Sequence, residues 1–465
     1  KRSRRDRIYR SGGGCGMREV NLTLDTFDVL SIISYSATHE INQHGRAFIR
    51  AIIEDKKENE YMDKAEKNKW IKVEAFDEDD RKSIIFCGVI ENLKFLKESG
   101  SSVMELQLVT GSALMEEKIR TRSFQGSNTY ENILEICKNE YEDAYYIVGD
   151  EQDKAISDFL VQYKENDWEF IKRIAKLKET ALIPDCQTKG VKYFFGIPKR
   201  IEKKLISTDI LLVMKREYSL YEVGSREIFG LGDRVSFNKK SYYIIKVESK
   251  TIGSELYHTY HLINNIEHII KKESRYNYKI IGASLTARIT GVENSKVMIS
   301  IDEDSLKKTG KNKWFDFSTI YSSSNGAGWY CMPEIEDTVR LYFPTENEGD
   351  AYVCSAVHKG DGGGIRNNPD NKIWRNKYGK EIRLSKDKIA ITSNKGDYIE
   401  ISDNEGVKIV SSGSINIKAK DRLEISSEES SISIAAGKRI FILQEDTQIV
   451  LKDGISVSGE GVNIS

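Results

Sequence analysis

Cysteine, proline and long apolar runs are all scarce in this chain of 465 residues, and each scarcity narrows the class of protein. The six cysteines are scattered, and none forms a Cys-x-x-Cys pair or another metal-ligand spacing, which predicts reduced thiols rather than a disulfide framework or a zinc site. No apolar run reaches about 18 residues, so no membrane-spanning helix is expected. The five prolines, with abundant Lys, Ile, Asn and Glu, are typical of proteins from AT-rich bacterial genomes.

Positive and negative charges nearly balance. The net charge is −1, although 31% of the residues are charged. This balance argues against a nucleic-acid-binding body. The exception is the start of the chain, where residues 1–10 contain six Lys or Arg residues and a glycine-rich stretch follows. A secretory signal would continue with an apolar stretch, and none does. We expect residues 1–16 to be a disordered basic tail, with a basic docking arm as the alternative, and Met17 to be the candidate natural start.

The strongest positive pattern lies in residues 373–465, where two apolar residues separated by one other residue return about every eight residues. This spacing places both apolar side chains on one face of a strand, and turn formers such as Asn-Lys-Gly at 394–396 separate the pairs. A short fixed period predicts a β-solenoid or β-prism. The pairs are Ile382/Leu384, Ile389/Ile391, Ile399/Ile401, Val407/Ile409, Ile415/Ile417, Leu423/Ile425, Ile432/Ile434, Ile440/Ile442, Ile449/Leu451, Ile455/Val457 and Val462/Ile464.

A single copy of this tract has nothing to cover its column of apolar side chains. Burying each of them stabilises a structure by roughly 1.5–3 kcal/mol, so about twenty of them drive strong self-association. Winding identical chains together, with the apolar pairs inside and the charges outside, also removes free strand edges. The pairs from Ile382 to Val457 are therefore predicted to form the core of a stiff, narrow rod with a mechanical role.

The rest of the chain is predicted to be mainly β. Short alternating or continuous apolar runs predict several strands in residues 17–111 and again in residues 205–279, which is typical of two small barrels. Five predicted strands in residues 280–358 suit an OB-type barrel. Residues 359–372, rich in glycine and asparagine, are predicted to be a linker before the rod at 373–465.

Residues 112–204 differ from their neighbours because they contain two helix patterns. An amphipathic helix is predicted over residues 128–141. A second helix is predicted after Asn166. Asn166 is a candidate N-cap, and Glu169 follows three residues later, which is the spacing of a capping box. This segment is interpreted as an α/β insert between the two barrels.

Candidate catalytic, metal and cofactor residues are few, and none is predicted to form a site. His258 and His261 lie three residues apart in a predicted strand, so they point to opposite faces and make a poor chelate. His39 and His44 flank a predicted turn with no suggestive partner nearby, which favours a loop role. The glycines at 362–364 lack the helix and the Lys-Ser/Thr of a phosphate loop. The aromatic residues of the OB-type segment are expected to be core or self-association contacts rather than a nucleic-acid surface: Trp314, Phe315, Phe317, Trp329 and Tyr330.

Several stretches, in order along the chain, resemble a known family. They are residues 40–45 (Glu-Ile-Asn-Gln-His-Gly), 86–90 (Phe-Cys-Gly-Val-Ile), 120–125 (Arg-Thr-Arg-Ser-Phe-Gln) with 130–133, 163–173 (Tyr-Lys-Glu-Asn-Asp-Trp-Glu-Phe-Ile-Lys-Arg) and 328–343 with 349–350. Together with the rod, they resemble the spike proteins of contractile injection systems, which include VgrG of type VI secretion and the baseplate hub–spike proteins of contractile-tailed phages. Glu336 departs from the family, which usually has Gly before Asp337, so a differently built turn is expected there.

The resemblance implies a non-enzymatic homotrimer with two tube-type β-barrel domains, an α/β insert, an OB-fold collar and a C-terminal triple-stranded β-helix or prism. Two barrels per copy imply a pseudo-sixfold ring that caps a hexameric inner tube protein. A PAAR-type tip protein is expected to dock at Val462, Ile464 and Ser465. Baseplate components and effectors are further expected partners, and nucleic acid is not. Assembly is expected in the bacterial cytoplasm, followed by ejection through the envelope of a target cell or by incorporation into a phage-tail-like particle.

Two other classes of function stay open. A tail-associated effector carrier or peptidoglycan hydrolase would need a catalytic insert, and the 14 residues of 359–372 are too few to hold an enzyme. A fibrous adhesin would carry a receptor-binding knob after the rod, and the chain has strand repeats there instead. The sequence leaves open whether the machine is a phage tail, a bacteriocin particle or a secretion system.

Overall fold

The computed structural model describes residues 20–67, 69–76, 80–126, 129–149, 159–207, 209–214, 219–270, 274–306, 313–360, 364–444 and 447–451. The chain divides into two compact units, residues 1–359 and residues 360–465. Both units are built mainly from β-strands. Within the described part of the chain, no helix is long and apolar enough to span a membrane.

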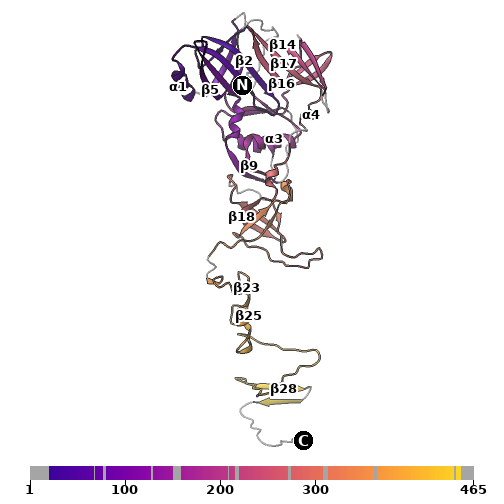
Figure 1. Ribbon diagram of the computed structural model, residues 1–465. Helices are drawn as coiled ribbons and strands as arrows, with labels where there is room; N and C mark the ends of the chain where they lie inside the picture. Colours follow the sequence, from indigo (N-terminus) through magenta and orange to yellow (C-terminus); the bar gives the residue numbers. More distant parts are fainter. Residues whose placement is uncertain are drawn as a thin grey trace, which may run out of the picture. The chain divides into compact units, whose positions relative to one another are not determined.

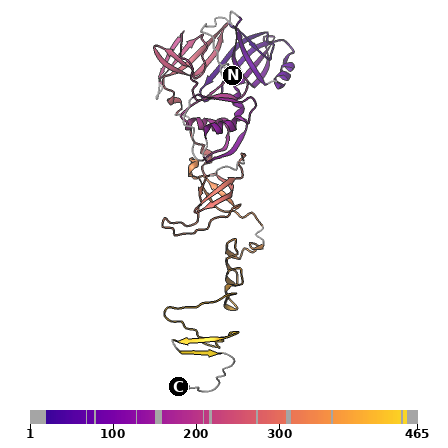
Figure 2. The same ribbon diagram turned by 180° about the vertical axis from the view of Figure 1, so that it is seen from behind.

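Most strands of the first unit belong to one 12-stranded sheet. Its main path runs β1-β4-β5-β6-β3-β2-β16-β17-β14-β13, and β15 and β12 branch from β16. The pairing of β2 with β16 joins two halves of the sheet, which lie side by side in Figures 1 and 2. The strands are β1 (Asn21–Leu24), β2 (Ser31–Glu40), β3 (Arg46–Ile53), β4 (Trp70–Phe76), β5 (Lys82–Glu98), β6 (Ser101–Val109), β12 (Lys203–Lys204), β13 (Asp209–Met214), β14 (Ser219–Ser225), β15 (Arg234–Phe237), β16 (Lys240–Ile252) and β17 (Glu255–Ile263).

Each half of this sheet has its own hydrophobic core. The alternating sequence of β3 shows why, since its apolar residues Ala47, Ile49, Ala51 and Ile53 all fall on the buried face. The two predicted barrels therefore share one continuous sheet, with separate cores on either side of the β2–β16 seam. Sequence periodicity could not reveal this seam, because it joins strands about 200 residues apart. In addition, α1 (Glu58–Lys67) packs against the first half through Tyr61, and α4 (Glu267–Ile270) follows the second half.

The segment between the two halves is the predicted α/β insert. Its α3 begins with Asn166 as the N-cap, whose side chain accepts a hydrogen bond from Glu169 N at 2.8 Å, as the capping pattern predicts. The other predicted helix is shorter than expected, because Thr129 caps it and it ends at Lys138. The elements are η2 (Gly111–Glu116), β7 (Ile119–Gln125), α2 (Tyr130–Lys138), β8 (Tyr145–Val148), β9 (Phe159–Asn166), α3 (Asp167–Leu177), β10 (Leu182–Pro184) and β11 (Lys192–Phe195).

Residues 280–358 contain a five-stranded sheet of order β20-β19-β18-β21-β22, which we call the small β module. All five strands were predicted, although β20 and β22 are shorter than their sequence patterns suggest. Strand β9 of the insert reaches into this module, since Phe159 and Val161 belong to its core while Leu160 belongs to the core of the insert. The elements are η3 (Tyr278–Ile280), β18 (Ser284–Glu293), β19 (Lys296–Ile301), β20 (Phe315–Asp316), β21 (Thr338–Tyr342), η4 (Glu348–Asp350) and β22 (Tyr352–Cys354).

The second unit contains an antiparallel meander and a separate hairpin. The meander runs β23-β24-β25-β26-β27. Residues 411–439, all of which the structure describes, form no strand. The elements are β23 (Lys372–Arg375), β24 (Glu381–Leu384), β25 (Lys388–Thr392), β26 (Tyr398–Ser402), β27 (Gly406–Val410), and the hairpin of β28 (Ile440–Gln444) and β29 (Thr447–Leu451).

Candidate assembly interface

The meander of the second unit aligns the predicted apolar pairs into two rows. Ile382 of β24 faces Ile391 of β25, and Ile391 faces Ile399 of β26. A second row of apolar side chains lies two residues further along each of the four strands. It is on the same face, because side chains two residues apart in a strand point to the same side of the sheet. The eight residues form what we call the apolar face: Ile382, Ile391, Ile399 and Ile409 in one row, and Leu384, Ile389, Ile401 and Val407 in the other.

The opposite face of the meander is polar and charged. Arg383, Ala390, Glu400 and Lys408 lie in register across it. Lys388 Nζ pairs with Glu400 Oε2 at 2.9 Å, which links β25 to β26 on this side. The sheet therefore has one face suited to water and one suited to burial.

Within its own copy, the apolar face is open to solvent. Seven of its eight residues are between 40% and 65% exposed, and Ile382 is half-buried. Isolated exposed apolar side chains are ordinary on protein surfaces, but a contiguous apolar sheet face is typical of an interaction site. In this structure the predicted core residues are therefore present as an aligned, uncovered surface.

The remaining predicted core residues divide into three groups. Ile415, Ile417, Leu423, Ile425, Ile432 and Ile434 are exposed and lie outside strands. The expectation of strands there is wrong for a single copy, because a strand needs a hydrogen-bonded neighbour and none is present between β27 and β28. In the hairpin, Ile440 faces Leu451 and Ile442 faces Ile449, so the pairing pattern resumes. Ile455, Val457, Val462, Ile464 and Ser465 lie outside the described residues.

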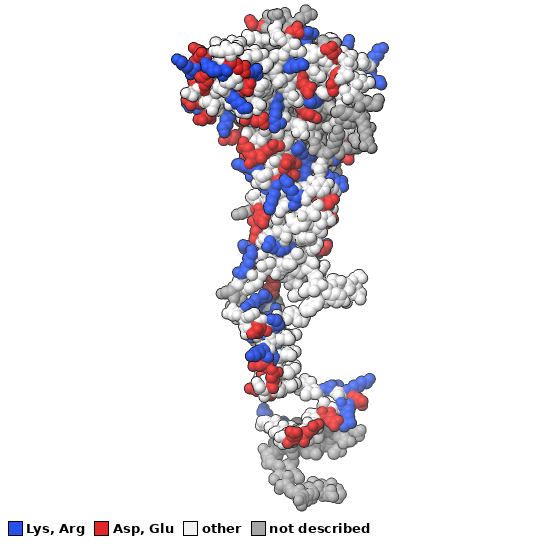
Figure 3. Space-filling model, viewed as in Figure 1, with Lys and Arg blue, Asp and Glu red and all other residues white. Residues whose placement is uncertain are grey.

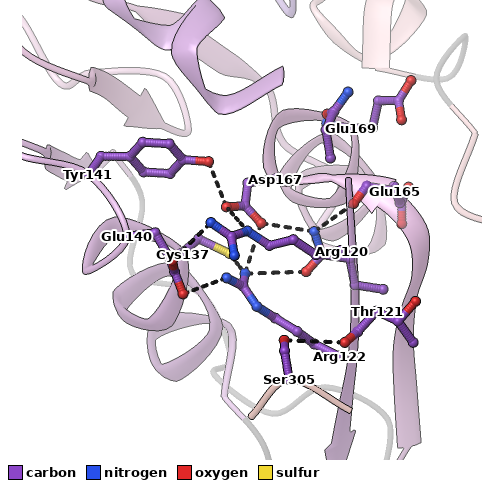
Figure 4. Close-up of polar contacts among 12 residues, drawn as sticks. Arg120, Thr121, Arg122, Cys137, Glu140, Tyr141, Glu165, Asp167, Glu169 and Ser305 are labelled. Carbon is purple, nitrogen blue, oxygen red and sulfur yellow. Dashed lines mark hydrogen bonds and ion pairs between the residues drawn. The ribbon is translucent and has the colours of Figure 1, made fainter. Parts of the chain in front are cut away.

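In the first unit, two of the family-like stretches meet at a buried carboxylate (Figure 4). Asp167 at the start of α3 accepts hydrogen bonds from Arg122 Nη1 at 2.8 Å, Gln162 Nε2 at 2.8 Å and Tyr141 Oη at 2.7 Å. The side chains of Asp167 and Arg122 are both fully buried. Such a site is closed to a substrate, so the arrangement is a polar framework of the insert.

Glu140 completes this framework on its outer side. Its two carboxylate oxygens pair with Arg120 Nη2 and Arg122 Nη2, each at 2.8 Å. Burial raises the pKa of Tyr141, and the hydrogen bond to Asp167 acts in the same direction, so its hydroxyl stays a donor. The Arg-x-Arg spacing of β7 therefore has a structural purpose, since both guanidinium groups reach the same pair of carboxylates.

A second buried ionic group joins the insert to the small β module. Arg173 Nε pairs with Glu165 Oε1 at 2.9 Å, and Arg173 Nη1 pairs with Glu348 Oε1 at 3.1 Å. Glu165 and Arg173 belong to the family-like stretch at 163–173, and Glu348 immediately precedes the family-like Gly349-Asp350. Sequence reasoning missed this contact because its partners are 175 residues apart.

His258 and His261 have different neighbours in the structure. His258 is buried and its Nδ1 lies 2.7 Å from Ser249 Oγ, whereas His261 lies 3.7 Å from Glu222 and 3.6 Å from Glu248. In the described ranges, no three His, Cys, Asp or Glu residues are grouped as a metal site would need.

His44 was expected to lie in a loop, and the structure gives it a more specific place. Its ring is buried, with Nδ1 2.8 Å from Ser112 Oγ and Nε2 3.1 Å from Glu116 Oε1. The three side chains resemble a hydrolase triad in composition. However, Ser112 is fully buried and cannot meet a substrate, so His44 fastens the turn after β2 to η2.

The aromatic residues of the small β module divide between its core and its surface. Phe315 is buried in the core and Phe317 packs against it, as expected. Trp329 and Tyr330 are 52% and 75% exposed, so they are not core residues of a single copy.

Comparisons with solved structures identify the fold. The E. coli c3393 protein, a component of the type VI secretion system with structural similarity to the T4 bacteriophage tail proteins gp27 and gp5, matches 73% of this chain and 100% of its own, with a TM-score of 0.52 and 13% identity. The lidded Francisella PdpA–VgrG complex matches 85% of this chain and 81% of the other, with a TM-score of 0.55 and 10% identity. Its lidless form matches 86% and 100%, with a TM-score of 0.53 and 9% identity.

No family model and no curated protein matches the sequence. The structural likeness nevertheless extends over most of this chain, both for c3393 and for the two forms of the PdpA–VgrG complex. The fold is the β-rich fold of these type VI secretion and VgrG structures. More specifically, the chain has the VgrG-type fold, and the resemblance that the sequence motifs indicate is confirmed at the level of the fold.

Proposed function

We propose that this chain is the non-enzymatic hub and spike subunit of a contractile injection machine, and that it acts as a homotrimer. The apolar face is the observation that carries the proposal. Two rows of branched apolar side chains, aligned over four strands and open to solvent, are stable in water only when another surface covers them. Three copies that share this face bury it, and their charged faces turn outward.

In the assembled spike, residues 411–439 take up the strand conformation that their sequence favours. Each copy then supplies the hydrogen-bonded neighbour that the others lack, and the apolar pairs from Ile382 to Val457 form the core. The result is the triple-stranded β-helix or prism that the family resemblance implies. A closed prism has no free strand edge, which suits a rod that must withstand force.

The 12-stranded sheet supports the proposed role as a hub. Each copy contributes two half-sheets with separate cores, so three copies present six similar units around a ring. Such a ring matches a hexameric inner tube protein in symmetry. The small β modules form an OB-type collar below it.

The proposed spike also implies other protein partners. A PAAR-type tip protein docks on the blunt end of the spike, at Val462, Ile464 and Ser465. The Francisella structures contain VgrG together with PdpA, which supports a protein cargo or partner for this chain as well. The machine punctures the envelope of a target cell, whether it belongs to a phage tail, a bacteriocin particle or a secretion system.

The test compares two carboxylates placed one residue apart. Ile417→Asp puts a charge inside the shared core three times over, whereas Asn416→Asp puts the same group on the outward face. Buried unpaired charges are strongly unfavourable. We expect Asn416→Asp to keep a particle of three times the chain mass of 53.0 kDa, and Ile417→Asp to lose it, as measured by mass photometry. A native chain that is monomeric, or an Ile417→Asp variant that stays trimeric, contradicts the proposal.

A further inference from the structure

The two halves of the 12-stranded sheet repeat one strand order (Figure 1). The first half runs β1-β4-β5-β6-β3-β2, and the second half runs β12-β15-β16-β17-β14-β13. The outermost pairing differs in direction, since β1 is antiparallel to β4 whereas β12 is parallel to β15, and the pairings inside it are antiparallel in both halves. In this repeat β5 corresponds to β16, and β2 corresponds to β13.

The correspondence extends to the details of the long hairpins. The pairing of β5 with β6 has a bulge at Glu91, and the pairing of β16 with β17 has one at Ile245. Seven residues after the bulge, each strand reaches the last pair of its hairpin, at Glu98 and at Ile252. A turn of two residues follows in both hairpins. Residues at the same distance from the bulge in β5 and in β16 are therefore equivalent.

One edge of the repeat is paired within the chain, and the equivalent edge is open. The seam pairs residues 246–250 of β16 with residues 36–40 of β2. The equivalent part of β5 is residues 92–96, which pair with β6 on one side. On its other side, no strand pairs with this part of β5 among the residues that the structure describes. Likewise, β13 pairs with β14 alone among the described strands.

The open edge strand β13 is strongly apolar. Ile210, Leu211 and Leu212 are 53%, 56% and 54% exposed, and because side chains alternate along a strand, both of its faces are apolar. On the face of the molecule drawn in Figure 3, charges of both signs are mixed over the upper part of the first unit, whereas residues 210–213 are Ile-Leu-Leu-Val. Soluble proteins usually protect a sheet edge with charges, proline or a covering segment. The edge of β13 is therefore suited to pairing with another strand.

Rows of facing residues show which residue of β13 is equivalent to which residue of β2. The row that starts beside the bulge ends at Ala37 in the first half and at Leu212 in the second half, so these two residues hold the same place. In the seam, Ala37 faces Ser249, and the equivalent of Ser249 in β5 is Phe95. The two rows are Ile90, Leu108, Ala47 and Ala37, and Ile244, Leu262, Tyr221 and Leu212.

We propose that β13 of one copy pairs with the open edge of β5 in a neighbouring copy, in the register of the seam. Leu212 then faces Phe95, and Leu211 faces Leu96. Phe95 and Leu96 are half-buried in their own copy, so apolar side chains of one strand meet apolar side chains of the other. Cross-strand contacts of this kind stabilise a sheet.

Each copy offers both partners of this contact, one edge on β13 and the other on β5. Such a head-to-tail contact, made three times, closes a ring around a threefold axis and leaves neither edge free. The second copy is the favoured occupant because the chain already makes the equivalent contact once, between β2 and β16. The inference rests on the proposed trimer, and it adds a contact in the hub that is separate from the C-terminal tract.

A disulfide that depends on the register tests the pairing in the full-length chain. Leu96→Cys combined with Leu211→Cys places two thiols on facing residues, whose Cα atoms lie about 4.5–5.5 Å apart in an antiparallel pair, a distance that a disulfide spans. Glutathione disulfide oxidises the two thiols and is itself reduced to two molecules of glutathione. We expect covalent products of two and three times the chain mass under denaturing, non-reducing conditions.

The matched control combines Leu96→Cys with Ile210→Cys, because Ile210 points to the opposite face of β13. We expect this pair to crosslink at least about tenfold more slowly. Leu96→Cys alone and Leu211→Cys alone give the background from the native cysteines. Equal rates for the matched and the shifted pair, or a crosslink confined to one chain, overturn the inference.

Amide hydrogen exchange of the native chain gives a second measurement that needs no variant. Amides point alternately to the two sides of a strand, so every second amide of residues 210–213 points away from β14. We expect all of these amides to be protected in the trimer, and rapid exchange of the outward amides overturns the inference. A negative result in either experiment, with mass photometry showing a trimer, leaves the proposed function standing. A monomeric native chain overturns both.

Discussion

Arg173 of α3 and Glu348 of η4 form an ion pair, with 3.1 Å between Nη1 and Oε1, and both side chains are about 5% exposed or less. Arg173 also donates to Val161 O at 3.0 Å and pairs with Glu165. Burial opposes the charge on Arg173, but Glu165 and Glu348 together keep its pKa above the ordinary value. One guanidinium group therefore joins the insert to the small β module.

We expect Arg173→Met to destabilise the first unit by about 3–5 kcal/mol, because two carboxylates are left buried without a cation. The matched control is Arg46→Met. Arg46 pairs with Glu91 at 3.2 Å on the surface, so this change should cost less than about 1 kcal/mol. Urea unfolding of both variants measures the difference, and equal losses would show that the buried pair has no special importance.

The contrast between these two pairs also shows what the sequence can predict. Alternation predicts strands such as β3, and local spacing predicts the Asn166 cap, because both depend on neighbours in the chain. The contact of Arg173 with Glu348 and the β2–β16 seam depend on residues 175 to about 200 positions apart, for which periodicity gives no signal.

The same reasoning explains the outcome in the second unit. The apolar pairs predict which face of the meander is apolar, since each strand carries its own pattern. They do not predict which segments are strands in one copy, because a strand also needs a hydrogen-bonded neighbour, and residues 411–439 form no strand in this structure. The exposed position of Trp329 could not be predicted either, since hydrophobicity alone does not tell which aromatic side chains a fold buries.

Glu336 gives a prediction about backbone strain. Glu stands where the resembling family usually has Gly, and the structure gives Glu336 a left-handed backbone with φ +73°. A residue with a Cβ is strained there. We expect Glu336→Gly to stabilise the first unit by about 1 kcal/mol in thermal unfolding.

Glu334→Gly is the control for this change, because it lies two residues away and has no left-handed backbone. Glycine there increases the freedom of the unfolded chain and relieves no left-handed strain, so a loss of at least about 0.5–1 kcal/mol is expected. If both glycine variants shift the melting temperature in the same direction, the turn at Glu336 is not strained.

Two histidines at the seam, His258 buried and His39 half-buried, predict that the first unit loses stability in mild acid. His39 and His258 lie on the same face of the sheet, on either side of β16, and burial lowers the pKa of each to about 4. Nε2 of His258 has no hydrogen-bond partner among the residues described here. An unfolded histidine has a pKa of about 6.5, so the unfolded chain takes up protons first, and stability falls as the pH drops from about 6.5 towards about 4.

The expected loss is about 3 kcal/mol for each histidine at the lower end of this range. Urea unfolding at pH 7 and pH 5 should show a smaller difference for His258→Gln than for the native chain. His358→Gln is the matched control, because His358 is exposed and lies outside the seam. A native chain that is equally stable at both pH values would exclude this account of the seam.

The last prediction concerns the point where the chain leaves the meander. Asp397, between β25 and β26, accepts hydrogen bonds from Ser412 N at 2.7 Å, Ser412 Oγ at 2.8 Å and Ser393 Oγ at 2.9 Å. The bonds from Ser412 contribute most, and together these donors lower the pKa of Asp397 to about 2. The carboxylate therefore fixes the start of the tract that continues to Ile415 and Ile417.

We expect Asp397→Asn to weaken this attachment and to speed amide hydrogen exchange at Ser412, while Asp403→Asn, in the next turn, leaves it unchanged. In the native chain the attachment should persist above about pH 4 and be lost as the pH falls towards about 2. The reason is that the pKa of Asp397 is lower in the folded chain than in the unfolded chain. If protection at Ser412 is the same in both variants, Asp397 does not hold the chain there. If it is lost only in Asp397→Asn, a single half-buried carboxylate fixes the point where the chain leaves the meander.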